Sequence, residues 1–201
     1  MLPWSDALRA VIGVKVADMV SKLTESNEQA VTDAYAATAK KAMDETVKAQ
    51  ITENVKKWAE VTKDSVVKSL QDEIETMLQG AYDENMSTQE LGRKMDDLID
   101  GRGELIARTE VNKSIGTGKF MAYKANGTKY KQWIHSGGGK FSREWHEDFD
   151  AMGPVPIDEP YPSEYGDIMF PGDPNADPGD LCNCRCSISE ADGPDEENYN
   201  D

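Results

Sequence analysis

The feature that most constrains this fold is a long helical pattern that contains no helix-breaking residue. Between Gly13 and Gly80 the chain has neither proline nor glycine. Apolar residues recur here every three or four positions, which is the spacing of one face of an α-helix. They are Val31, Tyr35, Ala39, Met43, Val47, Ile51, Val55, Trp58, Val66, Leu70, Ile74 and Met77. Because the run exceeds one globular helix, we expect a long hairpin or a bundle, with a break between Thr52 and Asp64 where the register drifts.

Helical segments also precede and follow this run. Near the N-terminus the same spacing predicts an amphipathic helix. Its apolar positions are Leu8, Val11, Ile12, Val16, Met19, Val20 and Leu23. Ser87 and Glu90 have the spacing of a capping box, which predicts a fresh helix, and Gly101-Arg102-Gly103 is expected to end it. Residues 1–86 are therefore either a plain antiparallel bundle or an arm that docks on other subunits.

The following segments indicate a smaller domain of mixed structure. A helix is expected from Glu104 to Lys124, and small residues at Ser114, Gly116 and Gly118 indicate that another backbone packs closely there. Residues 129–135 alternate like a strand, and residues 154–178 read as a Pro/Gly-rich loop with extended pieces near 167–170. The highly charged residues 191–201 predict a disordered acidic tail.

These patterns predict an α+β fold. It consists of a long N-terminal helical region over residues 1–86, followed by a small compact domain over residues 87–190. In that domain we expect helices to pack on a short antiparallel sheet that contains the Trp133 strand and a strand carrying the cysteines.

Charge is distributed unevenly along the chain, whose formal net charge is -16. Residues 102–143 carry nine Lys/Arg against two acids, whereas residues 144–201 carry one base against seventeen acids. Either the two halves neutralise each other in one fold, or the basic segment contacts nucleic acid or an acidic partner. The lysines available for such contact are Lys113, Lys119, Lys124, Lys129, Lys131 and Lys140.

The apolar runs and the cysteines of the sequence predict the cellular compartment of the protein. No run of about 18 apolar residues exists, so no membrane span is expected, and the N-terminus is a poor signal peptide. Three cysteines at alternate positions do not suit a secreted disulfide framework. We therefore expect a protein made and kept in a reducing cytoplasm.

Two alternatives exist for the cysteine segment. On a strand, Cys182, Cys184 and Cys186 share one face, and with His146 they have the composition of a Cys3His zinc site. Alternate spacing separates same-face neighbours by about 6–7 Å at the backbone, which is wide for one tetrahedral ion. We therefore favour buried thiols for Cys184 and Cys186, an exposed Cys182 and no cofactor, with zinc as the alternative.

The segment around the second histidine also has two interpretations. A helix from Ser142 places Arg143, His146 and Asp150 on one face, where they can form an acid/base set of a hydrolase or nuclease. The favoured interpretation is a network that fixes the Pro-rich loop to the helix. On the preceding helix, Arg108 and Glu110 cannot share a face, and Asn112 lies one turn after Arg108.

The order of motifs in the second half of the chain resembles a known family. The motifs are Ala107-Arg108-Thr109-Glu110, Lys131-Gln132-Trp133, Arg143 with His146, Gly153-Pro154-Val155-Pro156, Phe170 to Pro174 and Asn183-Cys184-Arg185-Cys186. Over roughly residues 88–190 they look like the phage Mu F-like minor head proteins, the tailed-phage head morphogenesis family. Where many relatives have a Cys-x-x-Cys pair, this chain has residues 135–140, so the resemblance does not imply a four-cysteine zinc site.

The resemblance implies a structural virion component rather than an enzyme. It implies a minor head protein that joins the capsid near the portal vertex during assembly in the host cytoplasm and then resides in the virion head. Portal and major capsid proteins are the implied partners, with weak contact to phage DNA on the packaging or ejection route. The expected structural network comprises Arg108, Glu110, Asn112, Trp133, Arg143, His146, Cys184 and Cys186. A hydrolase or nuclease is the alternative.

Overall fold

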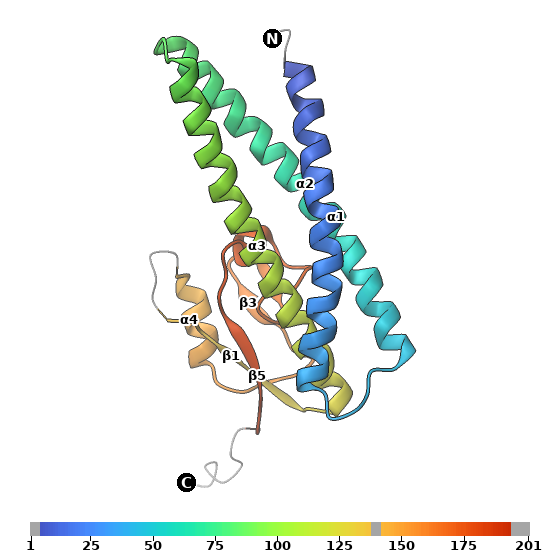
Figure 1. The fold of residues 1–201 in the computed structure, drawn as a ribbon. Helices are drawn as coiled ribbons and strands as arrows, with labels where there is room; N and C mark the ends of the chain where they lie inside the picture. Colours follow the sequence, from blue (N-terminus) through green and yellow to red (C-terminus); the bar gives the residue numbers. More distant parts are fainter. Residues whose placement is uncertain (1–4, 138–141, 194–201) are drawn as a thin grey trace.

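The computed structural model describes residues 5–137 and 142–193 of the chain (Figure 1). Three long helices precede a small C-terminal part, which confirms the predicted α+β fold. The helices are α1 (Ser5–Thr38), α2 (Glu45–Asp83), α3 (Thr88–Asn126), α4 (Glu144–Ala151) and α5 (Pro178–Leu181). The strands are β1 (Tyr130–Ile134), β2 (Val155–Pro156), β3 (Tyr161–Ser163), β4 (Gly166–Ile168) and β5 (Ser187–Ala191).

The break in the helical run lies earlier than predicted. α2 passes without interruption through residues 52–64, and the chain reverses between Thr38 and Glu45 instead. Asp44 begins α2 because its side chain accepts a hydrogen bond from the Val47 amide at 2.9 Å. The α1–α2 connection is also held by the end of α3, because the Asn126 side chain accepts a hydrogen bond from the Lys40 amide at 2.6 Å. A contact over 86 residues of sequence cannot be detected in a local pattern.

The predicted helix end at Gly101-Arg102-Gly103 is also wrong. α3 runs through all three residues and is 39 residues long. Glycine in a helix interior costs about 1 kcal/mol relative to alanine, which tertiary contacts can offset. Here Arg102 donates to Ser69 on α2 at 2.7 Å and pairs with Glu73 of the same helix. The predicted start of α3 is confirmed, because Ser87 accepts from the Glu90 amide at 3.2 Å.

The helical core lies where the three long helices meet. Val31 of α1, Ile51 and Val55 of α2 and Ile74 further along α2 are almost fully buried in one cluster. The side chains of the apolar positions from Leu8 to Leu23 lie outside the described residues. Among the described residues, no helix is both long and apolar enough to cross a bilayer.

The small sheet is antiparallel and has β1 in its centre. The strand order is β2-β1-β5, and Trp133 of β1 is opposite Ile188 of β5. β3 and β4 form a separate hairpin. The aromatic side chains of Trp133, Phe149 and Tyr161 pack edge to face or tilted in the core of this part.

Ala191 still belongs to β5, opposite Tyr130. The boundary predicted for the tail at residue 191 is therefore wrong for Ala191, and residues 194–201 lie outside the described part.

α3 connects the helical region to the sheet through close backbone contacts. A Cβ atom at Gly118 would lie 2.5 Å from the Val31 carbonyl oxygen of α1, and a Cβ atom at Gly116 would collide with the Pro171 carbonyl. Ser114 is fully buried beside them. This confirms the prediction that the small residues of this helix mark close packing. The division predicted at residue 86 falls in the turn before α3, and α3 itself contacts both parts (Figure 1).

Candidate functional site

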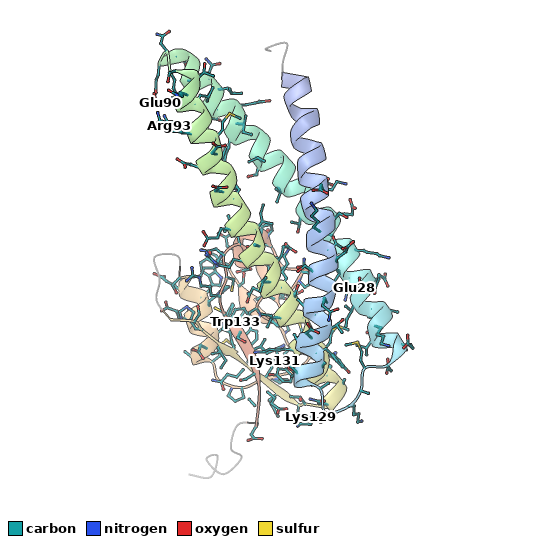
Figure 2. All side chains as sticks on the ribbon, in the orientation of Figure 1. Glu28, Glu90, Arg93, Lys129, Lys131 and Trp133 are labelled. Carbon is teal, nitrogen blue, oxygen red and sulfur yellow. The ribbon has the colours of Figure 1, made fainter. Side chains whose placement is uncertain are left out.

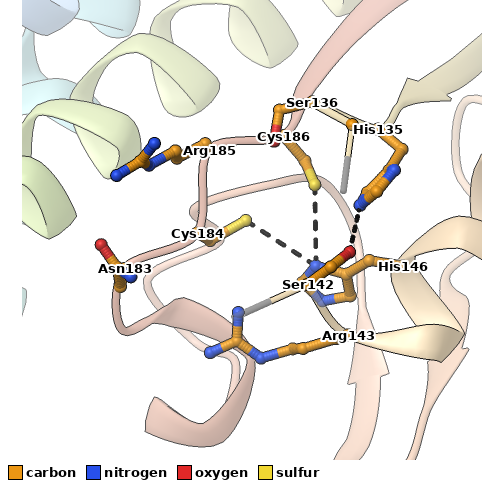
Figure 3. Close-up of a pocket in the computed structure, with 10 residues that line it drawn as sticks. His135, Ser136, Ser142, Arg143, His146, Asn183, Cys184, Arg185 and Cys186 are labelled. Carbon is orange, nitrogen blue, oxygen red and sulfur yellow. Dashed lines mark hydrogen bonds between the residues drawn. The ribbon is translucent and has the colours of Figure 1, made fainter. Parts of the chain in front are cut away.

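A cavity of about 250 Å³ opens beside the cysteine segment. It lies between the end of β1, the start of α4 and the turn that precedes β5 (Figure 3). Its lining is rich in groups that carry chemistry. The lining residues are His135, Ser136, Gly137, Ser142, Arg143, His146, Asn183, Cys184, Arg185 and Cys186.

Two cysteine sulfurs and one imidazole nitrogen lie close together at one wall of this cavity. The His146 Nδ1 atom lies 3.8 Å from the Cys184 sulfur and 3.7 Å from the Cys186 sulfur. All three ligand atoms lie within 4.8 Å of one another, and all three residues are buried. Figure 3 shows both sulfurs turned toward the imidazole ring. The sequence-predicted grouping of His146 with Cys184 and Cys186 is therefore present.

The turn before β5 brings the two sulfurs together. The predicted cysteine strand is wrong, because β5 begins only at Ser187. Asn183 instead adopts a left-handed backbone with φ of 59°, a conformation that asparagine tolerates better than most residues. Cys182 lies on the other side of this turn and is exposed, as predicted, while Cys184 and Cys186 are buried. Cys182 therefore does not complete a Cys3His site.

Asp180 fixes the orientation of the His146 ring from the opposite side. Its Oδ1 atom lies 3.4 Å from the Nε2 atom of His146. Trp145 Nε1 donates to the same carboxylate at 2.8 Å, and the Ser163 hydroxyl donates to it at 2.5 Å. Because a carboxylate only accepts, the ring proton belongs on Nε2, which leaves the lone pair of Nδ1 directed at the sulfurs.

The two buried thiols influence each other's protonation. Hydrogen bonding to Cys186, followed by burial, raises the pKa of Cys184. Hydrogen bonding from Cys184 lowers the pKa of Cys186 against the effect of burial. The proton is therefore held more tightly at Cys184 than at Cys186.

The proposed acid/base set does not converge on a substrate position. Arg143 donates through Nε to the Gly179 carbonyl at 2.6 Å and through a terminal nitrogen to the Cys182 carbonyl at 2.8 Å. Asp150 instead accepts from the His135 amide at 3.2 Å and does not line the cavity. Arg143 thus fastens α4 to the loop that contains α5, which is the network interpretation of this segment.

The expected structural network divides into two separate groups. Arg108 donates to the Asn183 side chain at 2.6 Å and pairs with Glu104, so it joins the cysteine turn to α3. Glu110 instead accepts from Asn27 of α1 at 2.9 Å and from Thr62 of α2 at 3.0 Å. Arg108 and Asn112 line the same shallow hollow on α3, in keeping with their spacing of one helical turn. The buried Asn112 Nδ2 has no hydrogen-bond partner within the described part of the chain.

The six lysines predicted to contact nucleic acid do not form one surface. Lys113 and Lys131 are buried, so that prediction is wrong for these two. Lys124 pairs with Asp158 at 2.6 Å, and Lys119 donates to Ser187 at 2.8 Å. Lys129 is exposed immediately before β1 (Figure 2). Lys140 lies outside the described residues.

Sequence reasoning missed the role of Asp180. It was one acid among many in a loop, and its partners Trp145 and His146 are 35 and 34 residues away. A local signal did exist for its neighbours, since Asp177-Pro178 is a helix start and Asp177 accepts from the Gly179 amide at 2.7 Å.

Comparison with known proteins assigns no activity to this site. No protein-family model matches the chain, and no solved structure matches it. A protein of Bacillus subtilis (strain 168), named uncharacterized protein YqbB, is 28% identical over 142 residues. The alignment covers 67% of this chain and 46% of that protein, so the chain spans about half the length of the curated relative it matches. The name of that relative states no function.

Proposed function

We propose that this chain is a structural minor head protein of a tailed phage or prophage. It associates with portal and major capsid proteins while heads assemble in the host cytoplasm, and it remains in the virion head near the route of DNA packaging or ejection. The observation that carries the proposal is the convergence in space of the motifs that resemble the Mu F-like family.

Contacts between motifs that are far apart in sequence support this proposal. Asn183, before the paired cysteines, accepts from Arg108 and donates its amide to Thr109 at 3.1 Å. The ring centroids of Trp133 and His146 lie 4.9 Å apart, edge to face. Motifs that pack on one another form one structural unit, so their shared order in the sequence has a physical basis.

The placement of Arg143, His146 and Asp150 favours this structural role over hydrolysis. Arg143 is engaged by two backbone carbonyls, and Asp150 is engaged by the His135 amide. A general base must reach a substrate, whereas His146 is only 2% exposed. These groups hold the α4 segment against the loops around it.

Head assembly from recombinant components tests the proposal. Portal, scaffolding and major capsid proteins of the same phage would be produced with and without this chain, and purified heads analysed by mass spectrometry. We expect the chain in few copies per head and in a complex with the portal protein. Heads assembled without portal protein serve as the control and should lack the chain. Retention of the whole chain in the unassembled fraction would contradict the proposal.

A further inference from the structure

We propose that His146, Cys184 and Cys186 bind one zinc ion, with the fourth coordination position facing the cavity. The ligand set is two thiolates and one imidazole, which suits zinc among the common divalent metals. The ion would join α4, which carries His146, to the turn before β5, which carries both cysteines.

The distances between the donor atoms fit a tetrahedral ion. With Zn–S bonds of about 2.3 Å and a Zn–N bond of about 2.0–2.1 Å, tetrahedral geometry separates nitrogen from sulfur by about 3.6 Å. Here the Nδ1 atom of His146 lies 3.8 Å and 3.7 Å from the two sulfurs. The two sulfurs lie within 4.8 Å of each other, against about 3.8 Å for tetrahedral Zn–S bonds of about 2.3 Å, so a bound ion would draw them together by up to about 1 Å.

The surroundings of His146 match those of a metal-bound imidazole. Metal-ligating histidines almost always donate their second ring N–H to a carboxylate, a carbonyl or water, which orients the ring. Asp180 fills this position at 3.4 Å and is itself held by Trp145 and Ser163. Asp180 is 1% exposed, and burial of a carboxylate is unfavourable unless it is well paired, so its place behind the ring indicates a specific role.

The remaining coordination position is directed at the cavity. The three donor residues line the cavity together with His135 and Ser142, whose side chains lie 2.8 Å apart at Nε2 and Oγ. Cys182 is exposed beyond the turn at Asn183 and does not join the cluster. A three-ligand site that keeps one open position is the arrangement of zinc sites that accept water or another small ligand.

Metal content and thiol reactivity of the purified chain test the proposal. Protein purified under reducing conditions without chelator would be analysed for zinc, and its cysteines alkylated before and after chelation. We expect about one zinc per chain. Cys184 and Cys186 should be protected until the metal is removed, whereas exposed Cys182 should be alkylated in both states and thus serves as an internal control.

Substitutions distinguish the residues that bind zinc from residues that only lie near it. Cys182→Ser should keep zinc at the wild-type level, whereas Cys184→Ser and Cys186→Ser should each lose it. Asp180→Asn should raise the zinc dissociation constant about 10–100-fold, as outer-shell changes do. If the cysteine variants fail to fold, the charge-transfer absorption of cobalt bound to wild-type protein reports thiolate ligation directly.

Two results would overturn the proposal. One is protein without bound zinc that also shows no cobalt charge-transfer band on titration. The other is equal alkylation of all three cysteines before and after chelation. These measurements use the isolated chain, so their failure would leave the proposed role in head assembly standing, and absence from heads would leave the metal site standing.

Discussion

Glu110 and Lys113 of α3 form a buried ion pair at the junction of the three long helices. Their charged atoms lie 2.7 Å apart, and their side chains are 3% and 9% exposed. Asn27 of α1 and Thr62 of α2 donate to the same carboxylate. Polar groups from three helices thus meet at one carboxylate, which fixes the relative register of the helices.

Removal of this carboxylate should strongly destabilise the protein. Glu110→Ala leaves the Lys113 ammonium buried without its partner, and a broken buried pair costs about 3–5 kcal/mol of unfolding free energy. Glu104→Ala on the same helix is the matched control, because its pair with Arg108 is largely exposed and should contribute about 0–1 kcal/mol. Urea denaturation of the three proteins measures both values. Equal urea midpoints for Glu110→Ala and Glu104→Ala would contradict the larger contribution of the buried Glu110–Lys113 pair.

Lys131 should make stability depend on pH in the alkaline range. Burial lowers the pKa of Lys131 from 10.5 to about 8, although its ammonium donates to the carbonyls of Ile157 and Glu159. Between these values the unfolded chain binds more protons than the folded chain, so the free energy of unfolding should rise with pH. The slope from this residue is at most about 1.4 kcal/mol per pH unit.

Denaturation between pH 7 and 11 measures this slope. Lys131→Met should lose it, whereas Lys129→Met, two positions away and exposed, should retain it. Identical pH profiles for wild type and Lys131→Met would show that Lys131 titrates alike in both states.

Glycines within the single helix α3 should respond oppositely to the same substitution. A Cβ atom at Gly116 meets the Pro171 backbone, whereas one at Gly101 meets nothing within 4 Å. We expect Gly116→Ala to destabilise the protein by about 1–3 kcal/mol through overpacking. Gly101→Ala should stabilise it by about 0.5–1 kcal/mol through lower chain entropy. Thermal unfolding distinguishes them, and two shifts of the same sign would contradict the observed packing.

The elements divide into those that local sequence determines and those that distant contacts determine. The β1 strand and the Ser87 cap depend on alternation and on residues three apart, so the sequence predicts them. The uninterrupted course of α3 through Gly101 depends on Arg102 reaching α2, and the α1–α2 turn depends on Asn126. Neither contact has a local signature.

The candidate site shows the same division. Proximity of His146 to the cysteines could be proposed from residue chemistry. Selection of Cys184 and Cys186 over Cys182 depends on the left-handed turn at Asn183, and the role of Asp180 depends on a contact with His146 over 34 residues. An alternating pattern does not reveal where a strand begins, so it could not exclude a three-cysteine face.

At the scale of the whole molecule, an exposed apolar pair on α3 is a candidate contact for the proposed assembly partners. Val111 and Ile115 are 51% and 40% exposed and lie one helical turn apart. They line a shallow hollow together with Ala107 and Arg185. Contiguous apolar surface of this kind marks interaction sites more often than isolated exposed residues do.

The double substitution Val111→Ser and Ile115→Ser should therefore weaken association with the portal protein without unfolding the chain. We expect at least a tenfold rise in the dissociation constant and a melting temperature close to wild type. Met152→Ser and Tyr165→Ser together form the matched control, because these residues are 51% and 53% exposed but lie in the part beyond β1. If both double variants bind the portal protein equally well, Val111 and Ile115 do not belong to the proposed interface.

The continuity of α3 has a mechanical consequence. At about 1.5 Å per residue its 39 residues extend roughly 58 Å. One end of this rod lies by Glu90 and Arg93 at the far tip of the helical region, and the other leads through Gly127 into the Trp133 strand (Figure 2). α3 is not interrupted at Gly101. A partner protein that holds the tip of this helix therefore also determines the direction in which the cysteine-lined cavity faces.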